Sequence, residues 1–346
     1  MTDAWKTNTT LDEIAADLRV AAEVVLLTHE KPDGDAVGAT LALARTLARI
    51  GVPATPVYNG GWSARFDPIV SDTPVLRLGD NPDLTRLPES PARIVIVDTG
   101  AWSQLAKVRP WLEPRTDRSI VIDHHLMGDT STAARRHIDT GVAAVCETIA
   151  QLCRRLLGVD RIVEFTPSIA EPLYLGLATD TGWFRHSNVS AHALRLAADL
   201  LDAGADHSRL YRLTEQSDNP CRLRLIGRAL SSMRLVADDA GAIMTLSRQD
   251  LRDCHATGDD TGGLTDMLLS IASVRVAASL TEVGPTRTKI SFRSKIGDNG
   301  DGAIDVNHIA HTLGGGGHAQ AAGARLDLPM DEARQRVERA LTDALT

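Results

Sequence analysis

Cysteines, aromatic residues and long apolar runs are all scarce in this chain of 346 residues. Its four cysteines, Cys146, Cys153, Cys221 and Cys254, form no CxxC pair, which disfavours a structural zinc site and favours buried free thiols in a reducing compartment. No apolar run reaches the roughly 20 residues of a membrane-spanning helix, and the first residues lack the pattern of a secretion signal. We therefore expect a cytoplasmic protein with no membrane partner.

The composition also restricts the kind of ligand. Aromatic residues make up only 3% of the chain, which argues against a long groove that stacks bases. The formal net charge is −8, whereas proteins that grip long nucleic acids usually carry a basic surplus, because counterion release drives that binding. We therefore expect a small phosphorylated partner and no long nucleic acid; the family resemblance described below implies that this partner is a small nucleotide or a short oligonucleotide.

The length and the segment pattern predict two domains. In the first two hundred residues, short β-branched runs alternate with helix-like segments. We expect strands at 24–29, 93–100 and 119–125, and helices at 11–22, 36–50, 142–157, 168–184 and 191–203. This rhythm is typical of an α/β fold with a doubly wound, mainly parallel sheet.

From about residue 210 the pattern changes. A polar stretch at 214–220 indicates a linker flanked by helix, and 233–247 reads as a hairpin. A strand at 288–294, a helix and glycine loop followed by a helix or strand within 304–326, and a closing helix at 331–345 complete the chain. We expect an α/β domain at 1–205, a linker at 206–228 and a smaller α+β domain at 229–346, with the active cleft between the two domains.

Acidic and histidine side chains gather where the three predicted strands end. They are His29, Asp33, Asp35, Asp98, Asp123, His124 and His125, and Asp180 follows a later helix. The carboxyl edge of a parallel sheet is where open α/β folds place their sites. Converging carboxylates would have to take up protons unless cations neutralised them, and two divalent cations sharing one carboxylate would do so.

Each feature also has a simpler explanation. A lone aspartate after a strand is usually a helix N-cap or a turn residue, and residues 32–35 form an ordinary turn sequence. However, capping does not predict three successive strands that all end in ligand-type residues. Mixed imidazole and carboxylate donors suit two Mn²⁺ ions, with Fe²⁺, Co²⁺ or Mg²⁺ as alternatives.

In order along the chain, His29-x-x-x-Asp33-x-Asp35, Asp98, Asp123-His124-His125 and Asp180 resemble the four motifs of the DHH phosphoesterase superfamily. Residues 314–324, GGGGHAQAAGA, resemble the signature of the accompanying DHHA1 domain. The resemblance spans nearly the whole chain. Among stand-alone members it points to the nano-RNase and 3′-phosphoadenosine 5′-phosphate phosphatase subfamily.

The resemblance implies a role for each residue of the motifs. One metal would be held by His29, Asp33 and Asp98, and the second by Asp35, Asp98, His124 and Asp180, so that Asp98 bridges both. Asp123 would orient a ligand, and His125 would face the substrate phosphate or the leaving oxygen. We expect these eight residues to form the catalytic centre.

The second domain is expected to grip the substrate. Glycines such as Gly315, Gly316 and Gly317 let backbone N–H groups approach an anion, a helix N-terminus after the loop would add a favourable dipole, and His318 can donate to a phosphate. The alternative for this loop is plain flexibility. Arg293 and Ser294 resemble the substrate-anchoring pair of the family, and the alternative for Arg293 is a surface salt bridge.

The function implied is hydrolysis of short oligoribonucleotides, 3′-phosphoadenosine 5′-phosphate, or both, by water that two metals activate. The first alternative is a cyclic di-AMP or pApA phosphodiesterase. A second, from another class, is a nucleotide sensor without catalysis on the same fold. The resemblance also implies a homodimer.

Overall fold

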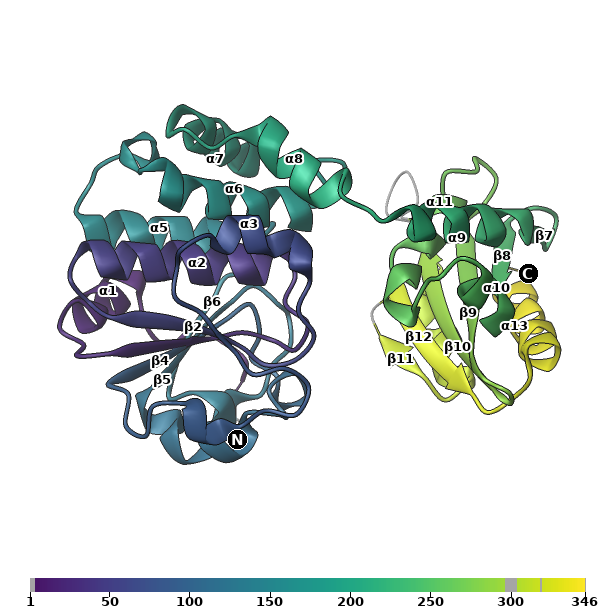
Figure 1. The fold of residues 1–346 in the computed structure, drawn as a ribbon, viewed down its shortest axis with the longest axis horizontal. Coiled ribbons are helices and arrows are strands. Elements are labelled where there is room, and N and C mark those ends of the chain that lie inside the picture. Colours follow the sequence, from purple (N-terminus) through teal and green to yellow (C-terminus); the bar gives the residue numbers. More distant parts are fainter. Residues whose placement is uncertain (1–3, 296–303, 318, 346) are drawn as a thin grey trace. The chain divides into compact units, whose positions relative to one another are not determined.

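The computed structural model describes residues 4–295, 304–317 and 319–345, which form two compact units that divide between Ser217 and Asp218 (Figure 1). The division falls inside the predicted linker, which is largely helical. Helix α8 (His207–Glu215) belongs to the first unit and α9 (Pro220–Ser231) to the second.

A six-stranded parallel sheet forms the centre of the first unit, with strand order β3-β2-β1-β4-β5-β6. The strands are β1 (Val24–Leu27), β2 (Ala54–Tyr58), β3 (Leu76–Arg77), β4 (Arg93–Val97), β5 (Ser119–Asp123) and β6 (Arg135–Ile138). The predicted doubly wound sheet is confirmed. The three predicted strands are present as β1, β4 and β5, each ending two or three residues earlier than expected.

Helices cover both faces of this sheet. Side chains alternate along β1, so that Val24 and Leu26 join the hydrophobic core on one face, whereas Val25 and Leu27 join the core on the other. The first face carries α1 (Leu11–Arg19), α2 (Gly34–Arg49), α3 (Asp67–Val70), α5 (Val145–Leu157), α6 (Pro167–Asp180) and α7 (Ala191–Asp202) (Figure 1). Helix α4 (Arg109–Leu112) lies on the second face.

The strand order reverses between β1 and β4, because β2 and β3 extend the sheet in one direction and β4 to β6 in the other. In open α/β folds, ligands bind beyond the carboxyl ends of the strands at this switch point. The fold therefore places the loops after β1 and β4 where a site is expected.

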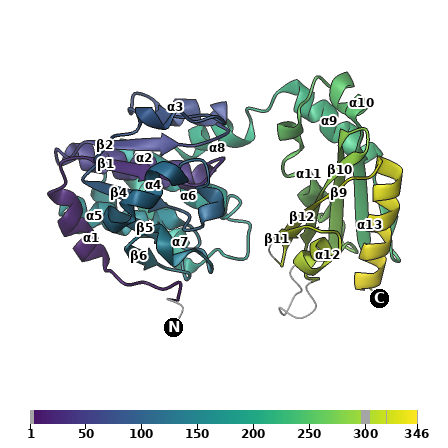
Figure 2. The same ribbon diagram turned by 90° about the horizontal axis from the view of Figure 1, so that it is seen from below.

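The second unit is built on a mixed sheet of order β11-β12-β10-β9-β8-β7. Its strands are β7 (Arg234–Val236), β8 (Gly241–Leu246), β9 (Val276–Gly284), β10 (Arg287–Ser294), β11 (Gly316–Gly317) and β12 (Ala321–Leu326). Helices α12 (Val306–Thr312) and α13 (Met330–Leu345) pack on one face, and α9, α10 (Arg248–Asp253) and α11 (Leu264–Leu268) on the other (Figure 2). The predicted hairpin is confirmed as β7 and β8, which pair antiparallel.

The thiols and the helices agree with the composition. Cys146, Cys153 and Cys254 are buried free thiols, and Cys221 is half-buried and also free. Within the ranges that the structure describes, no helix combines the length and the apolar character needed to cross a membrane.

Candidate metal centre

Eight predicted residues lie at the carboxyl edge of the first sheet, in four segments of chain. In the first segment His29 follows β1, Asp33 caps α2, and Asp35 lies in the first turn of α2. In the second segment Asp98 follows β4. In the third, Asp123 ends β5 and is followed by His124 and His125, and in the fourth Asp180 ends α6. The short apolar strands thus deliver polar side chains to one edge of the sheet, as the sequence predicted.

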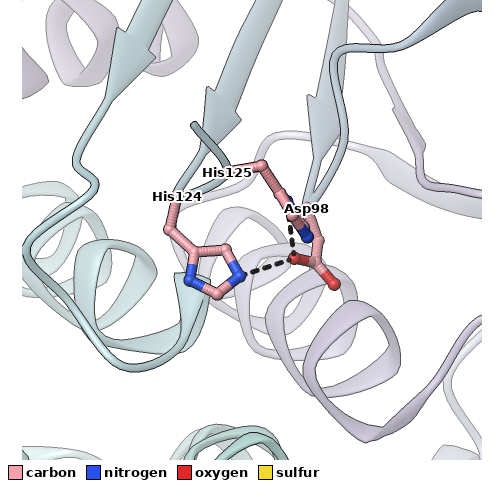
Figure 3. Close-up of side chains that lie close together, drawn as sticks. All are labelled: Asp98, His124 and His125. Atoms are coloured by element: carbon pink, nitrogen blue, oxygen red, sulfur yellow. Dashed lines mark ion pairs between the residues drawn. The ribbon is translucent and has the colours of Figure 1, made fainter. Parts of the chain in front are cut away.

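Asp98 stands at the centre of the cluster (Figure 3). Its Oδ2 lies 3.5 Å from His29 Nε2, and its Oδ1 lies 3.3 Å from His124 Nε2 and 4.0 Å from His125 Nδ1. The two carboxylate oxygens therefore face different histidines. This is the arrangement that a carboxylate shared between two cations requires.

The predicted ligands fall into groups whose donor atoms lie within 4.8 Å of one another. One group is His29, Asp33 and Asp98, the set predicted for the first metal. Another group holds three of the four residues predicted for the second metal, namely Asp35, His124 and Asp180. The fourth predicted ligand, Asp98, contacts this group through His124. The Nε2 atom of His124 lies 3.6 Å from Asp180 Oδ2.

Backbone N–H groups hold two of the carboxylates. Asp33 Oδ1 accepts hydrogen bonds from Asp35 N and Ala36 N, both at 3.0 Å, so Asp33 is a helix N-cap as well as a member of the cluster. Asp35 is fully buried, and its oxygens accept from Val145 N at 2.6 Å and Cys146 N at 3.0 Å. These donors open α5, and the positive end of its dipole favours a negative charge there.

Asp98 has two features that are typical of a functional site. Its φ of 64° lies in the left-handed region, a conformation that costs of the order of 1–3 kcal/mol and is typical of functional sites. The residue is 3% exposed, and no described donor makes a hydrogen bond of good geometry to its Oδ1. A buried carboxylate oxygen without such a bond is rare, and a ligated cation would satisfy it. The donor set therefore fits a metal.

The carboxylates repel one another in the metal-free protein. Burial, followed by the charges of Asp98 and Asp180, raises the pKa of Asp35 well above its ordinary value. Burial and the charge of Asp98 raise the pKa of Asp180 to about 7. The site therefore retains protons where cations would otherwise balance the charge.

The two histidines respond in the opposite sense. Burial disfavours the charged imidazole of His29, but the neighbouring carboxylates of Asp33 and Asp98 outweigh burial and raise the pKa of His29 to about 11. For His124, burial is likewise outweighed by Asp98 and then Asp35, which raise its pKa to about 10. Both imidazoles therefore hold a proton at neutral pH that an incoming metal must displace.

Asp123 lies behind the cluster and belongs to none of its groups among the described residues. It is fully buried, and its Oδ1 accepts from His124 N at 2.8 Å and lies 2.7 Å from His125 Nδ1. Although His125 also falls in a group with Asp98 and His124, the ring nitrogen nearest the cluster is engaged by Asp123. The remainder of this half-exposed imidazole is available to a substrate.

The predicted substrate residues lie in the second unit. Arg293 Nε is 3.2 Å from Asp266 Oδ1, so the salt bridge named as its alternative is present. Ser294 is 6% exposed, and its hydroxyl donates to Ala319 O at 3.4 Å. His318 lies outside the described residues. Whether these residues bind substrate stays a prediction.

Of the two alternatives left open after the glycine loop, a helix or a strand, the structure has the strand. Gly316 and Gly317 form β11, which pairs antiparallel with β12, so among the described residues after the loop no helix N-terminus supplies the expected dipole. A Cβ at Gly315 would lie 2.1 Å from Gly323 O, and one at Gly317 would lie 2.5 Å from Ala321 O. Close strand packing therefore requires these two glycines, whatever they bind.

Sequence patterns missed the residues that hold the cluster from behind. The backbone of Val145 and Cys146 anchors Asp35 from more than a hundred residues away. The side-chain amide of Asn188 donates to Asp180 O at 3.1 Å and to Ala143 O at 3.2 Å, which ties the end of α6 to the start of α5. No local pattern signals contacts of this kind.

Comparisons with known proteins agree with this geometry. Residues 23–177 match the N-terminal domain of the DHH family, and residues 245–345 match the DHHA1 domain. The bifunctional oligoribonuclease and PAP phosphatase NrnA of Thermus thermophilus is 33% identical over 331 residues, which cover 94% of this chain and 91% of that protein.

Two solved structures share the fold. An exopolyphosphatase-related protein from Bacteroides fragilis superposes with a TM-score of 0.86 at 24% identity, covering 97% of this chain and 96% of the other. RecJ of Thermus thermophilus, solved in complex with Mn²⁺, gives a TM-score of 0.54 at 17% identity, covering 96% of this chain and 54% of RecJ. With both domains matched and a relative aligned along nearly its whole length, this chain belongs to the DHH/DHHA1 family of metal-dependent phosphoesterases.

Proposed function

We propose that this protein hydrolyses short oligoribonucleotides and 3′-phosphoadenosine 5′-phosphate with the help of two divalent cations. The observation that carries the proposal is the cluster around Asp98, in which one buried carboxylate faces His29 on one side and His124 on the other. The name of the Thermus thermophilus relative, an oligoribonuclease and PAP phosphatase, supports the substrate class.

One cation would be held by His29, Asp33 and Asp98. The other would be held by Asp35, Asp98, His124 and Asp180. When bound, such cations activate a water molecule and neutralise the charge that develops on phosphate oxygens. The mixed nitrogen and oxygen donors favour Mn²⁺, the ion bound in the structure of RecJ.

Asp123 and His125 act beside the metals in this proposal. Asp123 fixes the ring of His125 through the 2.7 Å contact to Nδ1, and it holds the backbone of both histidines. A ring held in this way presents its remaining edge to a phosphate or to the leaving oxygen, where an N–H group stabilises developing charge. In this proposal the pair therefore holds an imidazole N–H group where it stabilises the charge on the leaving oxygen.

The second domain would select the length of the substrate. Arg293, Ser294, Gly315 and strand β11 (Gly316–Gly317) would hold the far phosphate or base, and a grip at one fixed distance favours short ligands over long chains. The net charge of −8 supports this choice. The cleft between the domains, the role of His318 and the homodimer stay predictions.

A panel of substrates assayed with Mn²⁺ tests the proposal. It compares dinucleotides, 3′-phosphoadenosine 5′-phosphate, cyclic di-AMP, pApA, long RNA and pyrophosphate, with a chelator control and the Asp98→Asn variant. We expect the highest kcat/KM for dinucleotides and 3′-phosphoadenosine 5′-phosphate. The Asp98→Asn variant should show no detectable turnover of either substrate. Preference for cyclic di-AMP or pApA would establish the first alternative instead. Nucleotide binding without turnover of any member would identify a sensor.

A further inference from the structure

Near its N-terminus the chain is attached to β6, the edge strand of the first sheet. The Thr7 hydroxyl donates to Ile138 O and accepts from Ile138 N, both at 2.8 Å. Asn8 N donates to Arg136 O at 2.8 Å, and its Oδ1 accepts from Arg136 N at 2.6 Å. These paired bonds fix the segment beside β6. They place Trp5 near the carboxyl ends of the strands, where the metal centre lies.

Trp5 contacts both loops that bear the central residues of the site. Its indole Nε1 donates to the backbone oxygen of His125 at 3.1 Å. A Cβ at Gly100 would lie 1.8 Å from the indole ring, and a Cβ at Gly128 would lie 2.4 Å from it. The ring therefore packs directly on the backbone of both glycines, and any larger residue at either position would displace it.

The two glycines that the indole contacts are close in sequence to residues of the metal centre. Gly100 comes two residues after Asp98, and Gly128 three residues after His125. The loops also contact each other, because Asp129 N donates to Gly100 O at 2.9 Å. The left-handed φ of Asp98 persists only when its surroundings hold it, and the indole is one of the groups that hold this loop.

We infer that Trp5 is a positioning residue, whose indole sets the spacing between the loop of Asp98 and the loop of His124 and His125. The inference rests on the metal centre and not on the substrate proposed above. A purely structural role would instead follow from the packing of Trp5 against the hydrophobic core beneath the sheet. The two roles differ in whether removal of the indole changes metal affinity or only stability.

The test measures Mn²⁺ binding to the metal-stripped full chain by calorimetry, together with melting temperature and the kcat and KM for bis(p-nitrophenyl) phosphate. Trp111→Phe is the matched control, because Trp111 packs in the same core and its Nε1 donates to a backbone oxygen, that of Pro88, at 3.0 Å. Pro88 belongs to neither loop of the site.

We expect Trp5→Ala to weaken Mn²⁺ affinity about 10- to 100-fold, as the loss of groups that orient ligands usually does, and to lower kcat with it. Trp5→Phe keeps a ring between the glycines but loses the bond to His125, and we expect roughly a 2- to 10-fold loss. Trp111→Phe should lower the melting temperature and leave Mn²⁺ affinity unchanged.

Wild-type Mn²⁺ affinity in Trp5→Ala, or an equal loss in Trp111→Phe, would overturn the inference. If Trp5→Ala does not fold, Trp5→Phe decides, and unchanged affinity in that variant overturns the inference as well. Because Mn²⁺ is titrated without any nucleotide, this outcome is independent of the substrate panel. A failed panel with a positive titration would refute the proposed substrates alone.

Discussion

Replacement of Asp98 by asparagine tests the metal centre most directly. The amide has the size of the carboxylate, and asparagine tolerates the left-handed φ of 64° better than most residues do, so the backbone should be preserved. Asp98 belongs to both predicted ligand sets, which means that one substitution weakens both sites. Since loss of a residue that merely orients a ligand costs about 10- to 100-fold, loss of a shared ligand should lower kcat by more than about 100-fold.

The stability of the metal-free variant should change little, because two effects oppose each other. The charge of Asp98 raises the pKa of Asp35 and of Asp180, and this repulsion disappears in the variant. The same charge attracts the protonated imidazoles of His29 and His124, and that attraction is lost too. We expect melting temperatures within roughly 3 °C of each other, since a net change of about 1 kcal/mol, left after these two effects partly cancel, shifts a domain of this size by about 2–4 °C.

The metal-bound proteins should differ strongly. At a Mn²⁺ concentration of a hundred times Kd, binding to one site stabilises the wild type by about 2.7 kcal/mol, or roughly 5–11 °C for the first unit. We expect Asp98→Asn to lose most of this shift, measured by calorimetric melting with and without Mn²⁺. Asp139→Asn is the control, because Asp139 follows β6 and belongs to no candidate metal group in the described parts of the chain. A full Mn²⁺ shift or wild-type turnover in Asp98→Asn would refute the shared-ligand geometry.

Three further predictions concern proton release on metal binding, Asp123 and Arg293. Because the pKa of His29 is raised to about 11 and that of His124 to about 10, Mn²⁺ must displace their protons, so its affinity should rise from pH 6 to pH 9. Calorimetry in buffers of different ionisation enthalpy measures the proton release, and a value of zero would contradict these pKa values. Asp123→Ala should lower kcat about 10- to 100-fold, whereas wild-type kcat would show that its contact to His125 is dispensable. Arg293→Ala should lower kcat/KM for dinucleotides roughly 10- to 150-fold but hardly change it for bis(p-nitrophenyl) phosphate. Arg287→Ala is the control, because it removes a similar surface ion pair on the same strand, and it should change kcat/KM for neither substrate. Equal losses on both substrates would place Arg293 in the catalytic site itself.

Local patterns predicted the parts of the fold that are buried on both faces. Strands β1, β4 and β5 are continuous apolar runs, because helices cover one side of the sheet and short helical turns the other. Strand β6 escaped prediction because it lies at the sheet edge and reads Arg-Arg-His-Ile. Strand β2 escaped because Pro56 interrupts its pattern.

The glycine-rich segment shows where a local pattern misleads. Gly314 to Gly317 read as an open loop that leads into a helix or a strand, since glycine weakens both regular structures. The decisive interaction is with β12, whose backbone lies so close to Gly315 and Gly317 that no side chain fits. Pairing with β12, a few residues further along the chain, decided the conformation, and the run of glycines alone does not show that it pairs as a strand.

The sequence by itself indicated which residues could bind metal, because several of them follow apolar runs whose burial is dictated by hydrophobicity, and Asp33 and Asp35 lie in the polar turn after the first of these runs. Tertiary structure decided how they are held. The N-terminus of α5 reaches Asp35 across 110 residues, and the indole of Trp5 reaches His125 across 120. Only the packed chain brings such groups together, since hydrophobic periodicity specifies which face of a segment is buried but not which distant segment covers it.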